Sequence, residues 1–503
     1  MSEVSLSPTV RAPNAPPAAS SPIAASRGIF ADNQWRPAHS DTIVEVVAPA
    51  EGRIFAKIAD ADSGDVNVAV AAARKAFDVG AWGRTSALER GRILSRYARL
   101  IGDHNLELAA IEARDTGKPM TLAKSDVVAT ARYFEFYGGA ADKLQGETIP
   151  YLTDFLVATV REPKGVTAHI IPWNYPAQMF GRTVGAALAV GNAVVVKPAE
   201  DACLSILRLA ELGAEAGLPP GALNIVTGRG ETAGAALTAH REIDFIAFTG
   251  SPEVGVLIQI AAARNHIGCT LELGGKSPHV VFADADLDKA VPAIVSGIIQ
   301  NAGQTCSAGS RVLVQRQLYD AAVARLAERF KRMTAGTPEM DLDLGPVINA
   351  RQKARVEGFA ERAAADGVPL LAQGRIADGV SSAGFFVAPR LFGPVPRGNA
   401  LAQLEVFGPT LAVLPFEDED DAIQLANGTE FGLMAAVWTE NGSRAMRAAK
   451  SIRAGQVYIN GFGAGGGIEL PFGGMKKSGH GREKGFEALY EYSALKTIIL
   501  NHK

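Results

Sequence analysis

The chain has 503 residues, 47% of them hydrophobic and 20% charged, and a formal net charge of −3. A single hydrophobic core stops growing at roughly 250–300 residues, so a globular chain of this length predicts two or more lobes. The charge gives no basic surface for nucleic acid, and no apolar run reaches the ~18 residues that span a bilayer. We therefore expect neither nucleic acid nor a membrane as a partner.

Residues 1–27 are rich in proline, alanine and serine and lack the continuous apolar stretch of a secretory signal. A segment of this composition buries too little apolar surface to offset its ordering entropy, so it predicts a flexible tail. An organelle-targeting segment is the weaker alternative, because Glu3 is acidic and only Arg11 and Arg27 are basic.

The three cysteines, Cys203, Cys269 and Cys306, are too few and too widely spaced for a disulfide framework or a cysteine-rich zinc site. Reduced thiols in a cytoplasmic protein fit this usage best. We expect no metal centre, and local context must show which thiol is reactive.

The N-terminal part predicts strands at Thr42–Val47 and Arg53–Ala56, helical spacing from Val66 to Ala113, and an extended segment over 151–163. From residue 165 onward, strands and helices alternate. The strands are predicted at Gly165–Ile171, Ala193–Val196, Leu223–Val226, Ile243–Phe248 and Thr270–Leu273, and the helices at Leu204–Ala216, Glu231–His240 and Pro252–Arg264. This alternation is typical of βαβ units and a mostly parallel sheet.

A second alternating series follows a join near residues 272–276. Its strands are predicted at Val280–Phe282, Arg311–Val314, Leu411–Pro415, Met434–Trp438 and Gln456–Ile459, and its helices at Leu287–Gln300, Tyr319–Arg332, Glu419–Ala426 and Gly442–Ile452. The fold class we predict is therefore α/β, with two parallel-sheet lobes. Such sheets bind ligands at the carboxyl ends of their strands.

Three motifs contain residue types that suit acyl chemistry. Cys306 follows an apolar helix within QNAGQTCSAGS, where small neighbours leave a thiol open to a substrate. Glu272 ends a strand between two leucines, a setting that raises the pKa of a carboxyl and suits a general base. Asn174 follows a strand in PWNYP, and its amide could donate to an oxyanion. Taken singly, each is more often a buried cysteine, a salt-bridged glutamate or a turn asparagine.

Three other places suit a dinucleotide. Lys197 and Glu200 end a buried strand in KPAE, where they could bind ribose hydroxyls. Gly250 and Ser251 begin a helix whose N-terminus could hold a pyrophosphate. The pair formed by Gly228 and Gly230 matches the G-x-G-x-x-G fingerprint only loosely, and each glycine element alone could be a tight turn.

Together these motifs resemble the aldehyde dehydrogenase superfamily over residues 28–503. The matching runs, in the family order, are PWNYP, KPAE, FTGS, LELGGKSP, GQTCS, EVFGP and PFGGMKKSG. The resemblance implies NAD-dependent oxidation of an aldehyde to the carboxylic acid, with two Rossmann-like lobes. It makes Cys306 the nucleophile that forms a thiohemiacetal and then a thioester, Glu272 the general base, and Asn174 part of the oxyanion hole.

The resemblance also implies the cofactor contacts. They fall on Ile170, Pro172, Trp173, Lys197, Glu200, Gly230, Phe248, Thr249, Gly250, Ser251, Leu273, Gly274, Glu405 and Phe407. Lys197 and Glu200 would contact the adenosine ribose, Ser251 the pyrophosphate, and Glu405 the nicotinamide ribose. Glu200 favours NAD, because a 2′-phosphate would meet its carboxylate, and NADP is the alternative.

The substrate contacts implied by the resemblance are Tyr175, Arg182, Thr305 and Ser307. Arg182 stands where many relatives that oxidise apolar aldehydes have an aromatic residue. An arginine there could face a carboxylated semialdehyde or pair with an acid of the protein. The alternatives for the activity are therefore a semialdehyde dehydrogenase and an aminoaldehyde or betaine-aldehyde dehydrogenase. The loop 461–467, which precedes Glu469, lies where the family varies its pockets.

The implied domain division assigns 28–144 and 163–272 to NAD binding, 273–480 to catalysis, and 145–162 with 486–503 to an oligomerisation segment. The run Tyr490–Leu500 is predicted as a β segment that completes a neighbour's sheet, so we expect a homodimer or homotetramer. Two other classes stay open: a coenzyme-A-acylating relative, which typically lacks the glutamate found at 272, and an inactive binding relative.

Overall fold

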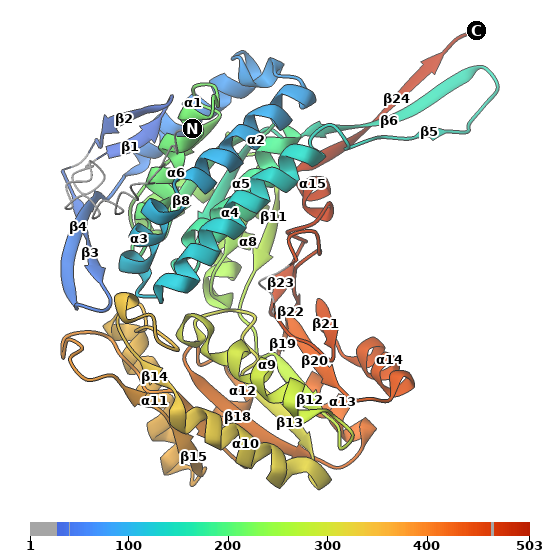
Figure 1. The fold of residues 1–503 in the computed structure, drawn as a ribbon. Helices are drawn as coiled ribbons and strands as arrows, with labels where there is room; N and C mark the ends of the chain where they lie inside the picture. Colours follow the sequence, from blue (N-terminus) through green and yellow to red (C-terminus); the bar gives the residue numbers. More distant parts are fainter. Residues whose placement is uncertain (1–27, 40, 464–466) are drawn as a thin grey trace, which may run out of the picture.

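The computed structural model describes residues 28–39, 41–463 and 467–503, arranged as shown in Figure 1. The predicted tail, 1–27, and the centre of the loop 461–467 lie outside these residues. The rest forms two α/β lobes, each on its own sheet, and a three-stranded arm that projects from the first lobe. The α/β class with two mainly parallel sheets is thereby confirmed.

The sheet of the first lobe has eight strands. In spatial order they are β2 (Gln34–Pro37), β1 (Gly28–Ala31), β9 (Leu223–Ile225), β8 (Ala193–Pro198), β7 (Val166–Ile171), β10 (Phe245–Thr249), β11 (Gly268–Glu272) and β23 (Gly479–His480). The five strands from β9 to β11 are parallel, and the chain order reverses between β7 and β10. A crevice forms at such a reversal, outside the carboxyl ends of the strands, and these ends hold the predicted motifs.

Helices cover both faces of this sheet. One face is covered by α1 (Ser63–Asp78), α7 (Ala235–Ala239) and α8 (Pro252–Arg264), and the other by α5 (Pro176–Val190) and α6 (Leu204–Glu215), outside which lie α2 (Ala87–Asp103), α3 (Asn105–Thr116) and α4 (Met120–Ala140). Almost every residue of α5 is buried, because α5 lies between the sheet and α4. The predicted helix Glu231–His240 is instead a π turn, Gly230–Gly234, followed by the short α7.

The second sheet has seven strands. Their spatial order is β15 (Leu370–Gln373), β17 (Arg390–Phe392), β18 (Thr410–Phe416), β13 (Arg311–Gln315), β12 (Pro278–Val281), β20 (Met434–Trp438) and β21 (Gln456–Ile459). All neighbours are parallel except β15 and β17. Successive residues of β13 point to opposite faces, so Leu313 and Val312 enter two separate apolar clusters. Around the sheet lie α9 (Leu287–Ile299), α10 (Tyr319–Arg332), α11 (Ala350–Ala365), α13 (Glu419–Asn427) and α14 (Gly442–Ser451).

The arm consists of β5 (Thr148–Ile149), β6 (Phe155–Pro163) and β24 (Ser493–Asn501), with β24 at one edge. The prediction of one β segment from Tyr490 is wrong in its first part, because Tyr490 belongs to α15 (Glu487–Glu491). Leu489 and Tyr492 are both 1% exposed in the core of the first lobe, and their spacing of three suits a helix rather than a strand.

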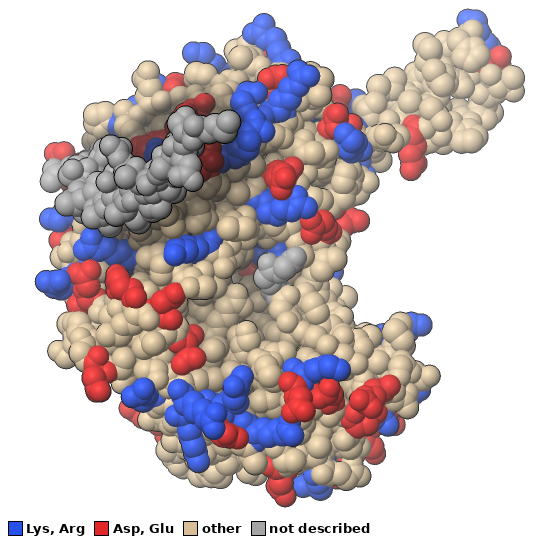
Figure 2. Space-filling model, viewed as in Figure 1, with Lys and Arg blue, Asp and Glu red and all other residues tan. Residues whose placement is uncertain are grey.

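Smaller elements complete the described chain. The hairpin of β3 (Ile43–Ala48) and β4 (Arg53–Ala59) agrees with the two strands predicted near the N-terminus. Within the described ranges, no helix is long and apolar enough to cross a membrane. On the face shown in Figure 2, Lys and Arg side chains are interspersed with Asp and Glu.

Candidate active site

Cys306 lies in a tight connection between α9 and β13. After α9 the chain makes a 3-10 turn, Gln300–Gly303, in which Asn301 and Ala302 have left-handed backbone angles (φ 49° and 54°). The Cys306 thiol is partly buried, and burial raises its pKa to about 12, although Arg182 opposes this shift. The thiol is therefore protonated at neutral pH and needs a proton acceptor before it can attack a carbonyl. Cys203 and Cys269 are buried free thiols.

Backbone packing fixes Cys306 against the link between the two sheets. A Cβ on Gly275 would lie 2.2 Å from the Cys306 carbonyl oxygen, so only glycine fits there. A Cβ on Gly274 would lie 2.7 Å from Glu405 Oε2. Because they have no side chains, Gly274 and Gly275 allow the chain to pass between the Glu405 carboxyl group and the backbone of Cys306.

The Asn174 side chain is anchored to the chain just before the thiol. Its Nδ2 donates to the Gln304 carbonyl oxygen at 2.9 Å, which uses one of its two amide hydrogens. The Asn174 carbonyl oxygen accepts from Asn301 Nδ2 at 2.8 Å and from Lys118 Nζ at 3.2 Å. The orientation of the amide therefore depends on the connection between α9 and β13 and on the loop before α4.

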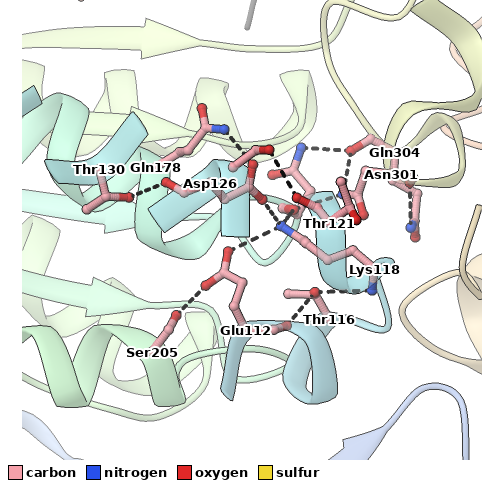
Figure 3. Close-up of polar contacts among 12 residues, drawn as sticks. Glu112, Thr116, Lys118, Thr121, Asp126, Thr130, Gln178, Ser205, Asn301 and Gln304 are labelled. Atoms are coloured by element: carbon pink, nitrogen blue, oxygen red, sulfur yellow. Dashed lines mark hydrogen bonds and ion pairs between the residues drawn. The ribbon is translucent and has the colours of Figure 1, made fainter. Parts of the chain in front are cut away.

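A buried polar network surrounds Lys118, as Figure 3 shows. Lys118 Nζ contacts Glu112 Oε1 at 3.2 Å and Asp126 Oδ2 at 2.5 Å, and all three side chains are essentially inaccessible to water. Burial opposes the ammonium charge, but Asp126 and Glu112 raise the pKa of Lys118, so it stays protonated. The network reaches the cavity beside the thiol through Gln178, whose Nε2 donates to Asp126 Oδ1 at 2.6 Å.

Glu272 ends β11 and is 1% exposed. Neither of its carboxyl oxygens has a hydrogen-bond partner among the described residues. Its nearest charge is Arg182, whose Nη2 lies 3.6 Å from Oε2. Burial raises the pKa of Glu272 well above its usual value, and Arg182 partly offsets this effect. A buried carboxyl without hydrogen bonds, near a thiol, is suited to accept a proton.

Arg182, on α5, is the centre of a buried charge cluster. Its Nε donates to Glu483 Oε2, and its guanidinium lies 4.6 Å from the centre of the Phe472 ring. Of the two interpretations of Arg182 made from the sequence, pairing with an acid of the protein is the one seen. The partner, Glu483, was not predicted; it follows the PFGGMKKSG run by a few residues.

A small cavity of about 40 Å³ lies beside the thiol. It is lined by Tyr133, Tyr175, Gln178, Met179, Arg182, Gln300, Thr305, Cys306, Ser307, Phe472 and Lys484. The structure thus brings together all four residues that we expected at the substrate. Lys484 and Phe472 were not expected, because both lie far from Cys306 in the sequence. Thr305 Oγ1 and Ser307 Oγ lie 3.2 Å apart.

The residues expected at the adenosine end of a dinucleotide lie at the carboxyl ends of β8 and β10. Lys197 Nζ contacts Glu200 Oε2 at 2.9 Å, with the lysine buried and the glutamate half-buried. Ser251 caps α8 by accepting from the Val254 N–H at 3.3 Å, and Gly250 follows Phe248 and Thr249 out of the sheet. Gly230 lies across this edge in the π turn, where a Cβ would meet nothing within 4 Å.

The residues expected at the nicotinamide end lie between the two sheets. Ile170 belongs to β7, and Pro172 and Trp173 form the turn that leads to α5. Phe407 has a left-handed backbone (φ 59°), and its ring meets Trp173 edge-on with the centroids 5.4 Å apart. Leu273 directly follows β11.

Glu405 is hydrogen-bonded to Gly275, the residue that packs against the backbone of Cys306. Its Oε1 accepts from the Gly275 N–H at 2.8 Å, and burial raises the pKa of Glu405 to about 7. In the described part of the chain, no group of three or more His, Cys, Asp or Glu side chains could hold a metal ion.

The fold and the site define an α/β enzyme in which a thiol, an amide and a buried carboxyl group lie where two parallel-sheet lobes meet. The sequence model of the aldehyde dehydrogenase family matches residues 35–498. Human retinal dehydrogenase 2 is 43% identical over 476 residues, covering 94% of this chain and 91% of the relative, and a mitochondrial benzaldehyde dehydrogenase of Antirrhinum majus is 42% identical over 474 residues, covering 94% and 88%. The chain belongs to the aldehyde dehydrogenase family and is therefore an oxidoreductase.

Solved structures agree with this assignment. A Burkholderia cenocepacia protein assigned to the aldehyde dehydrogenases is 58% identical and superposes with a TM-score of 0.94, covering 95% of this chain and all of that one. The NAD+ complex of a Bacillus cereus aldehyde dehydrogenase is 39% identical with a TM-score of 0.92, covering 95% and 97%. The family resemblance stated from the motifs is confirmed.

Proposed function

We propose that the protein oxidises an aldehyde to the carboxylic acid with NAD as the hydride acceptor and Cys306 as the nucleophile. The observation that carries this proposal is the position of the half-buried Cys306 thiol. It lines a cavity close to the buried carboxyl group of Glu272, which has no hydrogen-bond partner among the described residues. The NAD+ complex of the Bacillus cereus relative supports the choice of cofactor.

The proposed reaction begins when Glu272 accepts the thiol proton, directly or through water, and Cys306 Sγ attacks the aldehyde carbon. The second amide hydrogen of Asn174 and the Cys306 N–H stabilise the oxyanion of the thiohemiacetal, as preorganised donors do in acyl transfer. The bound cofactor supplies the acceptor for the hydride that leaves this carbon. After Glu272 has released the thiol proton to solvent, its carboxylate accepts a proton from a water molecule that hydrolyses the thioester and releases the acid.

The residues at the strand ends fit NAD. Glu200 lies on the surface beside Lys197, where a carboxylate can accept hydrogen bonds from a ribose diol. The N-terminus of α8 offers backbone N–H groups to a pyrophosphate, and Gly250 gives room there. Glu405, held by the Gly275 N–H, suits the second ribose. A 2′-phosphate would meet the Glu200 carboxylate, so we propose NAD rather than NADP.

The test is NADH formation from a panel of aldehydes by the wild-type enzyme and by Cys306→Ala. We expect the variant to lose turnover altogether while it still binds NAD with nearly unchanged affinity, because the thiol forms the covalent intermediate but does not hold the adenosine. Absorbance at the NADH band and a direct NAD titration measure the two properties. Turnover by Cys306→Ala at the wild-type rate would rule out the mechanism.

A coenzyme-A-acylating reaction and an inactive binding role are the other candidates. Glu272, which hydrolysis requires, is buried beside the cavity, and this favours hydrolysis over transfer to a thiol. An assay with and without coenzyme A separates the two reactions. We further propose a cytoplasmic location and the domain division stated above, although some relatives, such as the benzaldehyde dehydrogenase, are named as mitochondrial.

A further inference from the structure

The turn that precedes Cys306 has a backbone conformation that L residues rarely adopt. Asn301 and Ala302, which are 3% and 1% exposed, both lie in the left-handed region, with φ of 49° and 54°. Such a conformation is costly for a residue with a Cβ and persists only where the surrounding structure holds it. The contacts that hold this turn therefore also fix the chain that leads to Cys306.

Gln304, which is 1% exposed, supplies these contacts. Its Nε2 donates to the Asn301 carbonyl oxygen at 3.0 Å (Figure 3), and its backbone N–H donates to the same oxygen at 3.0 Å. Its Oε1 accepts from the N–H of Ile348, just before α11, at 2.9 Å. A flipped amide would set donor against donor and acceptor against acceptor, so only one orientation fits. Gln304 thus closes the turn and ties it to a segment 44 positions away.

Both proposed oxyanion donors are connected to Gln304. Asn174 Nδ2 donates to the Gln304 carbonyl oxygen at 2.9 Å, and the Cys306 N–H follows two positions later in the same chain. A short stretch of backbone therefore separates the two donors. Since a displacement of about 1 Å can cost roughly a hundredfold in rate, the placement of this stretch bears directly on the reaction.

We propose that Gln304 is a positioning residue, which sets the separation of the two oxyanion donors by holding the left-handed turn and tying it to the chain before α11. The inference rests on the proposed function and adds a residue to it. Gln304 is not among the described residues that line the cavity beside Cys306, so its effect passes through Asn174 and the Cys306 N–H. Steps that form an oxyanion should therefore depend on Gln304, whereas reactions of the thiol that form none should not.

The experiment compares two reactions of the Cys306 thiol in the wild type and in Gln304→Met, which keeps the length of the side chain but makes neither hydrogen bond. The first is aldehyde oxidation, which forms an oxyanion, and we expect its kcat to fall by about 10- to 100-fold with little change in KM for NAD. The second is alkylation by iodoacetamide, in which the sulfur displaces iodide and no oxyanion forms. Its rate, measured at Cys306 by peptide mass spectrometry, should change little.

Three further variants separate positioning from folding. Ala302→Gly allows the left-handed turn at little cost, because glycine has no Cβ, so it should recover part of the kcat that Gln304→Met loses. In the Asn174→Ala background one donor is already absent, so Gln304→Met should add little to the loss. Gln424→Met is the matched control, since it makes the same substitution at an exposed residue of α13, and it should change neither reaction.

The outcomes distinguish this inference from the function beneath it. A kcat that Gln304→Met leaves unchanged, equal losses in oxidation and alkylation, or a loss of NAD affinity in this variant would overturn the inference alone. No recovery by Ala302→Gly would overturn the part assigned to the turn, and full multiplication of the losses in Asn174→Ala would overturn the action through the donors. No NADH from the wild type with any aldehyde would overturn the proposed function and this inference with it.

Discussion

At Glu272, burial and a neighbouring guanidinium act in opposite directions on one carboxyl group. Burial disfavours the carboxylate and raises its pKa, whereas Arg182, 3.6 Å away, favours the carboxylate. A base must be ionised to accept a proton. Hydrolysis of the thioester should therefore speed up as the pH rises through the raised pKa of Glu272, and not level off near the pKa of an ordinary glutamate.

This balance gives a prediction for the charge of Arg182. Removing the guanidinium removes the influence that lowers the pKa of Glu272, so the rising limb of the hydrolysis rate should move to higher pH. The double variant Arg182→Gln with Glu483→Gln is the suitable protein, because Arg182→Gln alone leaves the buried Glu483 unpaired at a cost of roughly 3–5 kcal/mol. Losing Glu483 removes an effect that raises the pKa of Glu272, but Arg182 has the larger effect, so the shift is reduced and not reversed. Single-turnover kinetics across pH, which separate acylation from hydrolysis, measure the shift.

Two controls accompany this measurement. Arg182→Lys keeps a positive charge and should leave the rising limb close to that of the wild type. Glu272→Gln should hydrolyse the thioester far more slowly at every pH while it still forms the acyl-enzyme faster than it releases acid. A hydrolysis profile in the double variant that coincides with the wild type would show that Arg182 does not tune this base.

Among elements, the network of Figure 3 joins α3, α4 and the loop before β13, and it reaches Asn174, which we propose as an oxyanion donor. Lys118 and Asn301 both donate to the Asn174 carbonyl oxygen, and Asn174 Nδ2 donates to Gln304. Lys118 itself is not among the described residues that line the cavity beside Cys306. Lys118 is therefore a positioning residue, and its effect on the reaction should pass through Asn174.

The prediction for Lys118→Met is a fall in kcat of about tenfold to a hundredfold, since a misplaced donor costs nearly as much as a lost one. KM for NAD should change little, because the residues proposed to bind the adenosine end of NAD lie at the end of β8 and the start of α8, away from Lys118. Glu112→Gln and Asp126→Asn are added so that no buried carboxylate loses its only cation. Steady-state kinetics of these variants in the wild-type and Asn174→Ala backgrounds form the measurement.

This double-mutant cycle distinguishes a positioning role of Lys118 from a role in the general stability of the fold. If Lys118 acts through the amide, its replacement should add little to the loss already caused by Asn174→Ala, whereas independent effects would multiply. Lys124→Met, at an exposed lysine on the neighbouring helix α4, should leave kcat unchanged. Full multiplication of the two losses would show that Lys118 supports the fold and not the amide.

The motif-bearing strands could be predicted from the sequence because each is a short apolar run that ends in a turn, as in β7, β10 and β11. The helix α4 could not be predicted in the same way. It begins at Pro119 without a side-chain cap, and the buried Asp126 and Thr130 interrupt its apolar spacing because they belong to the network. Polar residues inside a helix become intelligible only when their partners are known.

Contacts between residues far apart in the sequence could not be predicted from local patterns either. Arg182 and Glu483 are separated by 301 positions, and Lys484 reaches the cavity from a stretch that resembles a surface loop. The residues that we propose for catalysis and cofactor binding were identified through their motifs, and several of them, such as Lys197 and Glu272, lie at the carboxyl ends of strands. The charged residues beside the cavity were not identified as a group, because only the fold brings these distant positions together.

At the scale of the whole molecule, the arm of the described structure has an exposed strand edge that lacks a partner. β24 forms an edge with one side of its backbone unpaired along nine residues, and Leu495, Ile498, Ile499 and Leu500 are each at least 50% exposed. A long apolar edge strand is a template for pairing with another chain, and Figure 1 shows that the arm stands clear of both lobes. We therefore predict a homodimer or homotetramer in which the arm joins a sheet of its neighbour.

Sedimentation velocity at micromolar concentration tests this assembly. The wild type should sediment as a dimer or tetramer, and Leu495→Glu with Ile499→Glu, which puts two charges on one face of β24, should shift it to smaller species. Leu106→Glu is the matched control, because Leu106 is 70% exposed on α3, away from the arm, and should not change the sedimentation. A monomeric wild type would contradict the prediction. It would also leave the apolar edge of β24 exposed to water, which is the situation that natural edge strands are built to avoid.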